Sequence, residues 1–320
     1  MSTVNYQLSM GKILILPLLC WAVAASAQNA GALPGVFSVA NDRQVQFSQG
    51  NLQYQPSTAT WRFAGHQYDM IGAANAKISA SYTGWIDLFC WGTGVNPASS
   101  ASDYRNYTTY TEWGANAISN AGNQAGQWRT LTKDECVYLL LTRENAATLC
   151  ALGKVRGVCG LILLPDNWQT PEGASFVPSS KKGFVKKSTY YKSAQQNGYS
   201  HNVYTAEQWA AMESAGAVFM PAVGYRWGKE LKHTGTDGCY WSSTANEEDK
   251  AEAYNVDFSA GYLGARSRTG LGFGQSVRLV CPAGKAAKPK RKPSIESLDT
   301  IPVPATVRPY KPWLQKSILF

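Results

Sequence analysis

The sequence has few of the residues on which metal-dependent and hydrolytic enzymes rely. Its 320 residues include only three histidines, His66, His201 and His233, and their spacing does not suit a shared metal ion. No two cysteines are separated by two residues, which argues against a zinc ribbon or a thioredoxin-like redox site. A serine nucleophile motif of the form G-x-S-x-G is also missing. These absences disfavour metal-dependent, redox and serine-hydrolase chemistry.

Long apolar runs are also scarce, and the one near the amino terminus is short. The apolar residues 13–25 follow a lysine, cannot span a bilayer, and end in a small-x-small cleavage pattern at residues 25–27. We therefore predict a signal peptide at residues 1–27 and an exported protein, located at the cell surface, in the periplasm or outside the cell. Leu19 before Cys20 is too large for a lipoprotein cleavage site, so we expect no lipid anchor and no integral membrane segment after cleavage.

The carboxyl-terminal segment differs in composition from the rest of the chain. Residues 282–320 hold seven of the 15 prolines with eight basic and two acidic side chains, so +6 of the formal net charge of +9 lies there. Such a segment cannot bury enough apolar surface to offset its ordering entropy, and we predict a disordered basic tail. The body, residues 28–281, is close to neutral, so the basic isoelectric point does not indicate nucleic-acid binding.

The body is long enough for one large core and retains six cysteines. Export permits disulfides, but six cysteines allow 15 connectivities and the sequence does not choose among them. The cysteines are Cys90, Cys136, Cys150, Cys159, Cys239 and Cys281.

The clearest helix start lies at Thr132. Its hydroxyl can cap the first turn while Glu135, three residues later, reaches back to the Thr132 N–H, which is a capping box. Cys136, with Val137 and Leu140, then begins an apolar stripe on one face. Thr205 predicts a second, smaller helix start. We expect one or two main helices.

The remaining patterns predict short antiparallel strands joined by long loops. Tyr254, Val256 and Phe258 alternate with polar residues, which indicates a half-buried strand. Gly157 permits a tight two-residue turn with Arg156. The expected strand regions are a meander over 35–63, a hairpin over 148–164, and strands over 217–221, 253–259 and 277–280.

Four pieces of the body resemble a known family. They are residues 128–135 (WRTLTKDE), 163–165 (LLP), 240–244 (YWSST) and 276–280 (SVRLV). In this order they resemble the formylglycine-generating-enzyme-like branch of the C-type lectin fold, and more closely the secreted major paralogous domain (FISUMP-like) proteins of Bacteroidetes and Fibrobacter. The family usually has Trp at the position of Cys136. The resemblance implies an α+β, C-type lectin-like fold for residues 28–281.

In this fold the long loops before the last strand form an exposed face. Tyr, Trp and Arg commonly anchor interfaces, because they bury large areas and make directed hydrogen bonds. We therefore predict a non-catalytic recognition domain that binds a protein or glycan ligand, with no catalytic residue, metal or cofactor. Trp241 is expected in the core. The candidate ligand-binding residues are Tyr225, Arg226, Trp227, Tyr240, Tyr262, Arg266 and Arg268.

Three other functions are weaker predictions. A structural component of a surface assembly, such as an adhesin or fimbria, stays open as an alternative for an exported chain. A formylglycine-generating oxidase would need two thiols close together near the last strand, where only Cys239 and Cys281 occur, far apart in sequence. Calcium-dependent sugar binding in this fold uses a Glu-Pro-Asn loop, which this sequence lacks. Residues 165–167 (PDN) match that motif only in part.

Overall fold

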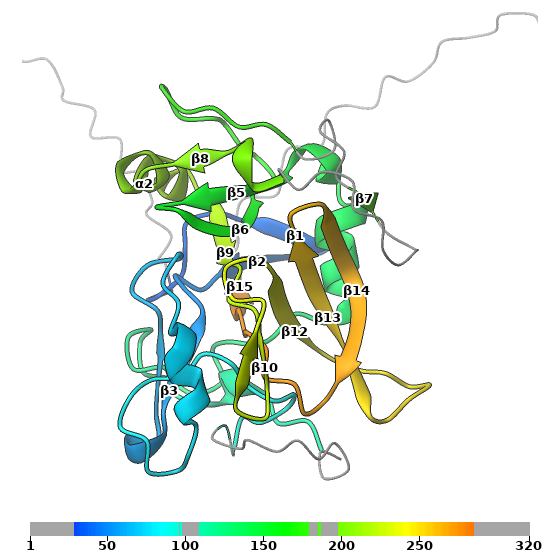
Figure 1. Ribbon diagram of the computed structural model, residues 1–320. Helices are drawn as coiled ribbons and strands as arrows, with labels where there is room; N and C mark the ends of the chain where they lie inside the picture. Colours follow the sequence, from blue (N-terminus) through cyan, green and yellow to red (C-terminus); the bar gives the residue numbers. More distant parts are fainter. Residues whose placement is uncertain (1–28, 96, 98–108, 179–184, 187–197, 285–320) are drawn as a thin grey trace, which may run out of the picture. The chain divides into compact units, whose positions relative to one another are not determined.

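The computed structural model describes residues 29–95, 97, 109–178, 185–186 and 198–284 (Figure 1). The predicted signal peptide and nearly all of the predicted basic tail lie outside the described residues. The chain divides between Gly284 and Lys285 into two units, and all of the described residues belong to the first.

The first unit is an α+β structure built mostly from short antiparallel strands, with few helices, as the sequence predicts. Within the described part of the chain, no helix combines the length and apolar character needed to cross a membrane.

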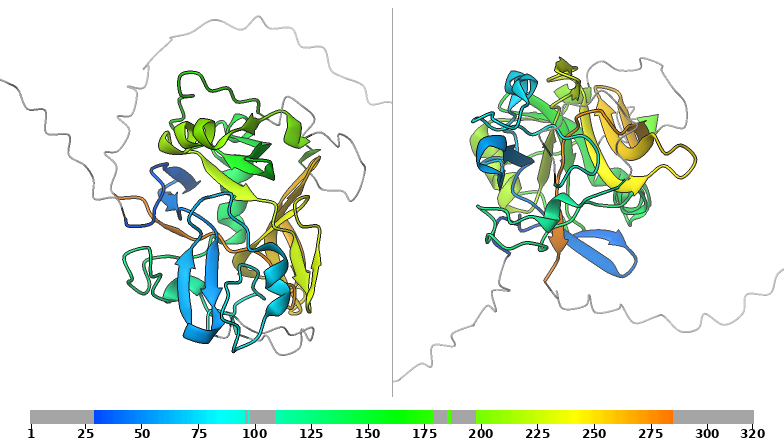
Figure 2. Two further views of the ribbon diagram at one scale, coloured as in Figure 1. Left: turned by 60° about the vertical axis from the view of Figure 1, so that its left-hand side comes forward. Right: turned by 90° about the horizontal axis from the view of Figure 1, so that it is seen from below.

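One sheet joins the two ends of this unit. Its order is β1 (Phe37–Ala40), β2 (Arg43–Phe47) and β15 (Val280–Pro282), all antiparallel. Figure 2 shows the blue amino-terminal strands beside the orange closing strand. The prediction of a regular strand over 277–280 is wrong in its bounds. Residues 277–279 form no ladder, although the carbonyls of Val277 and Leu279 accept single bonds from other segments.

A second sheet has the order β8 (Val203–Tyr204), β5 (Cys150–Val155), β6 (Val158–Leu163) and β9 (Val218–Pro221). The predicted hairpin is confirmed, since β5 and β6 pair along their full lengths. Its turn residues, Arg156 and Gly157, have φ of 51° and 81°, as a turn with two left-handed residues requires.

A third sheet contains residues of the candidate site described below. Its order is β12 (Gly238–Ala245), β13 (Glu252–Ser259), β14 (Tyr262–Gly270) and β7 (Val185–Lys186). The simple alternation predicted for β13 is wrong, because the register shifts between Asn255 and Asp257. Asn255 is buried and bonds to Gln275, whereas Tyr254 is only partly buried.

Two hairpins, β3–β4 and β10–β11, and several helical turns complete the unit. The two hairpins are formed by β3 (Leu52–Gln55), β4 (Thr60–Phe63), β10 (Tyr225–Trp227) and β11 (Glu230–Lys232). The helices are α1 (Lys133–Val137) and α2 (Ala206–Ser214). A π-helical turn, η5 (Tyr138–Thr142), continues α1, and the 3₁₀ turns are η1 (Pro56–Thr58), η2 (Gly72–Lys77), η4 (Trp113–Ala115), η6 (Ala146–Thr148) and η8 (Gly198–Ser200).

The capping box predicted at Thr132 and the helix start predicted at Thr205 are both confirmed. The Thr132 hydroxyl accepts from the N–H of Glu135, whose carboxylate accepts from the N–H of Thr132. Thr205 and Gln208 repeat the arrangement at α2. These reciprocal bonds satisfy N–H groups that the first helical turn leaves without partners.

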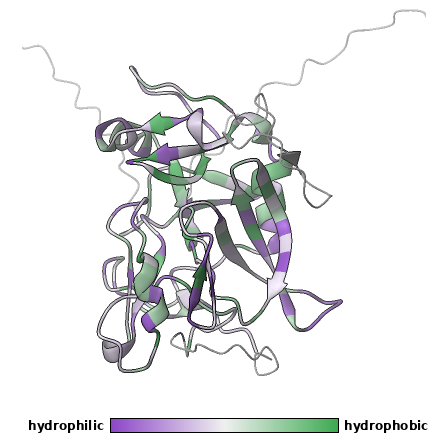
Figure 3. Ribbon diagram, viewed as in Figure 1, coloured by the Kyte–Doolittle hydropathy of each residue, from purple (hydrophilic) through white to green (hydrophobic). Residues whose placement is uncertain are grey.

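The core consists of buried apolar clusters that span the sheets. Phe37 and Phe47 meet edge to face with ring centroids 5.0 Å apart, and Cys136 and Leu140 of the α1–η5 segment join the same cluster. Trp241 lies in a second cluster and is 3% exposed, which confirms its predicted core position. In Figure 3 many of the strands around this core carry green segments, whereas β14 has purple bands along its middle.

Candidate functional site: an aromatic face beside a polar network

The β10–β11 hairpin presents two of the predicted residues to the surface. Successive side chains of a strand point to opposite sides, and β10 shows this pattern: Tyr225 and Trp227 are partly exposed while Arg226 is fully buried. In the hairpin register Tyr225 faces Lys232 and Trp227 faces Glu230. The hairpin therefore places two large rings on one outer side.

A third ring comes from the loop after β14. Phe273 packs against Trp227 with centroids 4.3 Å apart and against Tyr225 at 5.5 Å. All three rings remain partly exposed. We name this surface, formed by Tyr225, Trp227 and Phe273, the aromatic face. Rings held in one packed group lose little conformational freedom when a ligand binds.

A polar network lies next to the aromatic face. His233 stacks on Tyr225 at 5.6 Å, and its Nδ1 lies 3.3 Å from Asp237 Oδ2. On the adjoining strands, Ser267 Oγ donates to Asp257 Oδ1 at 2.6 Å. Burial raises the pKa of Asp257, and the negative charge of Asp237 adds to that increase. The network therefore combines two carboxyl groups whose charges act on each other.

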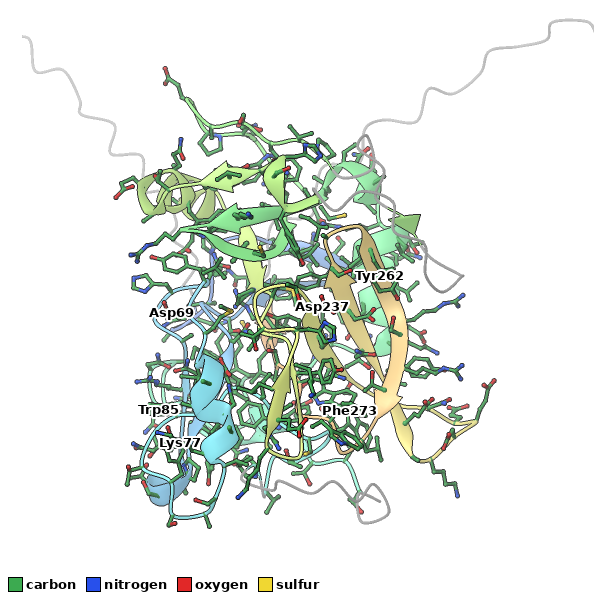
Figure 4. The ribbon with its side chains drawn as sticks, viewed as in Figure 1. Asp69, Lys77, Trp85, Asp237, Tyr262 and Phe273 are labelled. Atoms are coloured by element: carbon green, nitrogen blue, oxygen red, sulfur yellow. The ribbon has the colours of Figure 1, made fainter. Side chains whose placement is uncertain are left out.

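Tyr262 completes this network through Ser267, whose Oγ lies 2.9 Å from the Tyr262 hydroxyl. A side chain at Gly264 would overlap Tyr262, Ser267 and Asp257, so only glycine lets their oxygens converge. Figure 4 labels Phe273, Asp237 and Tyr262 around the β10–β11 hairpin.

The structure corrects two predicted ligand-binding residues, Arg226 and Tyr240. Arg226 is 0% exposed and its Nη1 donates to the Gly228 carbonyl at 2.5 Å. Tyr240 is 2% exposed, and its hydroxyl donates to the Pro221 carbonyl at 2.7 Å. Arg226 faces inward because of strand alternation, whereas β12 is buried on both of its faces at Tyr240 and Trp241. Neither Arg226 nor Tyr240 can therefore touch a ligand at the surface.

Arg268 is exposed but belongs to a different surface. It lies opposite Tyr254 in the β13–β14 register, and the Lys133 ammonium of α1 lies 4.9 Å from that ring. The pair is therefore on the side of the sheet that α1 covers, away from the aromatic face. Arg268 also forms an ion pair with Glu248 at 3.2 Å. Arg266 is exposed two residues earlier.

Residues that bear on the alternative functions have structural partners. Asp166 lies in residues 165–167, the partial match to the calcium-binding loop. Its carboxylate accepts hydrogen bonds from Ser38 Oγ at 2.7 Å and from Arg143 Nη1 at 2.9 Å. Cys136, Cys159, Cys239 and Cys281 form no disulfide with one another. Burial raises the pKa of the Cys136 thiol to about 12, and it also raises the pKa of the Cys239 thiol. Both thiols are therefore protonated at neutral pH. Within the described ranges, no three His, Cys, Asp or Glu side chains are grouped to hold a metal ion.

Sequence reasoning missed Phe273, Asp237 and Ser267. Phe273 stands between two glycines just before the closing segment, and an aromatic residue in such a loop is a usable signal. Asp237 follows His233 by four residues in a polar turn, which no periodic pattern marks. Ser267 reaches Asp257 only because of the strand register, which composition does not reveal.

Comparison with known proteins gives one partial match. Neither a curated protein nor a solved structure matches the chain. Residues 176–280 match the model of a family described as Domain of unknown function (DUF8237). The matched segment contains both the aromatic face and the polar network, so these features belong to the part of the chain that this family model describes.

Proposed function

We propose that this protein is an exported, non-catalytic recognition domain with a C-type lectin-like fold, and that its aromatic face binds a glycan or protein ligand. The observation that carries the proposal is the packing of three partly exposed rings, Tyr225, Trp227 and Phe273, on two segments that precede the closing strand. Large rings of this kind supply most of the binding energy at many interfaces.

The polar network supports the same surface. Aromatic rings bind the apolar face of a sugar or an apolar side chain, while nearby carboxyl and hydroxyl groups orient the ligand through hydrogen bonds. Asp237 and Ser267 are placed for this second role, because each joins the network that adjoins Tyr225. Arg266 is a secondary candidate in this proposal, whereas Arg268 lies on the other side of the sheet and is not part of it.

The test is a screen of the mature protein against arrays of glycans and of extracellular proteins. Wild type is compared with Trp227→Ala, which removes a ring of the aromatic face. Trp85→Ala is the matched control, because Trp85 is also partly exposed but stacks under Arg62 on another segment. The proposal expects ligands that wild type and Trp85→Ala retain and Trp227→Ala loses. Equal binding by all three proteins would refute it.

A further inference from the structure

An internal cavity lies beneath α1, within the core of the first unit. Its volume is about 30 Å³. A water-sized species needs about 10–15 Å³ of such space, so the cavity admits a single small molecule or ion. Its lining is apolar except for Tyr240 and Arg278, with side chains from α1, η5, β6 and β13 around them.

Arg278 is a buried cation that contacts no carboxylate in the described part of the chain. It is 4% exposed, and its Nη1 and Nη2 donate to the neutral amide oxygens of Asn51 at 3.1 Å and Gln67 at 2.7 Å. Its Nε has no hydrogen-bond partner among the described residues. An unpaired N–H in a buried guanidinium is unusual, because almost all buried polar groups are hydrogen-bonded.

The charge of Arg278 is only indirectly balanced. Burial lowers its pKa to about 10, which still leaves it protonated at neutral pH, while Tyr240 and Glu213 act in the opposite direction. Glu213 reaches Arg278 through Gln67, whose Nε2 donates to Glu213 Oε2 at 2.9 Å. An uncompensated buried ion costs several kcal/mol. A water molecule at Nε would satisfy the N–H alone, whereas an anion would satisfy the N–H and the charge.

We propose that this cavity is a binding site for a small monovalent anion of the size of chloride, held by the charge and the Nε–H of Arg278. The surrounding apolar side chains, including Leu140 and Val256, leave room for one small ion. The site is separate from the aromatic face and does not depend on its function.

The test measures the thermal unfolding midpoint of the full chain in sodium chloride and in sodium gluconate at equal ionic strength. A ligand that binds only the folded state raises the midpoint with concentration. The proposal expects a rise in chloride that gluconate does not reproduce. The rise should be lost in Arg278→Met and kept in Arg266→Ala, an exposed arginine control. Equal midpoints in the two salts, or a chloride effect that survives Arg278→Met, would overturn it.

A crystal grown in sodium bromide gives a second readout if Arg278→Met does not fold. The expected result is an anomalous bromine peak within about 3.5 Å of Arg278 Nε in the wild-type protein. Density for ordinary water at that position, without anomalous signal, would overturn the proposal.

Discussion

Arg129 and Val280 exchange two backbone hydrogen bonds, 2.9 Å from Arg129 N to Val280 O and 2.8 Å from Val280 N to Arg129 O. The side chain of Arg129 also holds Glu135, the capping residue of α1, at 2.6 Å. This arrangement joins the helix start to the closing segment across about half the chain. Two pieces of backbone that lie far apart in the sequence therefore meet at the start of α1.

The first prediction concerns Glu135→Gln. The Glu135 carboxylate is buried and accepts from both Arg129 and Arg43, so losing its charge should reduce the free energy of unfolding by about 1–3 kcal/mol. Chemical denaturation at pH 7 measures this loss. Asp134→Asn, a neighbouring exposed carboxylate, should have little effect.

The same variant should change the pH dependence of stability. Burial would raise the pKa of Glu135, but hydrogen bonds from Arg129, Thr132 and Arg43 lower it overall, below its ordinary 4.5. Its contribution is therefore present above about pH 4.5 and lost on acidification below that value. Glu135→Gln should lack this component, and an unchanged acid-unfolding profile would contradict the assignment.

The second prediction concerns Asp87, which is fully buried and accepts from Asn75 Nδ2 and the N–H of Ile71. Burial raises its pKa to about 6 despite these bonds. The folded state therefore takes up a proton more readily than the unfolded state, and stability falls as pH rises from about 4 to 6. Asp87→Asn should remove this fall, which denaturation at pH 4, 5, 6 and 7 would measure. A steeper fall in the variant would refute it.

The third prediction concerns Gln67, which uses all of its hydrogen-bonding capacity inside the protein. Its Oε1 accepts from Phe219 N and Arg278 Nη2, and its Nε2 donates to Ala217 O and Glu213 Oε2. Gln67→Leu would leave several buried groups without partners, at about 1–3 kcal/mol for each. We expect a total loss of at least about 3 kcal/mol by urea denaturation. The exposed neighbour variant, His66→Ala, should stay near wild type.

The fourth prediction uses the β5–β6 turn. Arg156 has φ of 51°, a conformation that glycine adopts without strain. Arg156→Gly should therefore change the free energy of unfolding by no more than about 0.5 kcal/mol, as most exposed substitutions do. Gly157→Ala, at φ of 81°, should cost about 1 kcal/mol even though no atom crowds the position. Equal unfolding midpoints for Gly157→Ala and wild type would contradict this account.

The sequence predicted those parts of the fold that depend on local chemistry. The capping box at Thr132, the helix start at Thr205 and the turn at Gly157 each need only a few adjacent residues, so short patterns suffice to find them. The bulge at Asn255 depends instead on pairing with β14 and on a partner, Gln275, that lies 20 residues later. No local periodicity carries that information.

The residues of the candidate site also fall into those that the sequence could indicate and those that only the tertiary structure reveals. Tyr225 and Trp227 could be found from residue type and position, but the identical argument selected Arg226, which strand alternation turns inward. Tyr240 was wrong for a different reason, because β12 is buried on both of its faces at residues 240–242. Phe273 could not be joined to the site from sequence, because its contacts depend on the path of the loop after β14.

Affinity for a ligand identified by the arrays is the most direct test of the aromatic face. We would measure dissociation constants by titration calorimetry for wild type, Phe273→Ala and Arg268→Ala. The account predicts that Phe273→Ala weakens binding at least tenfold, about 1.4 kcal/mol or more, while Arg268→Ala stays within about twofold of wild type. Wild-type affinity in Phe273→Ala together with a tenfold loss in Arg268→Ala would contradict the account and place the ligand on the other side of the sheet.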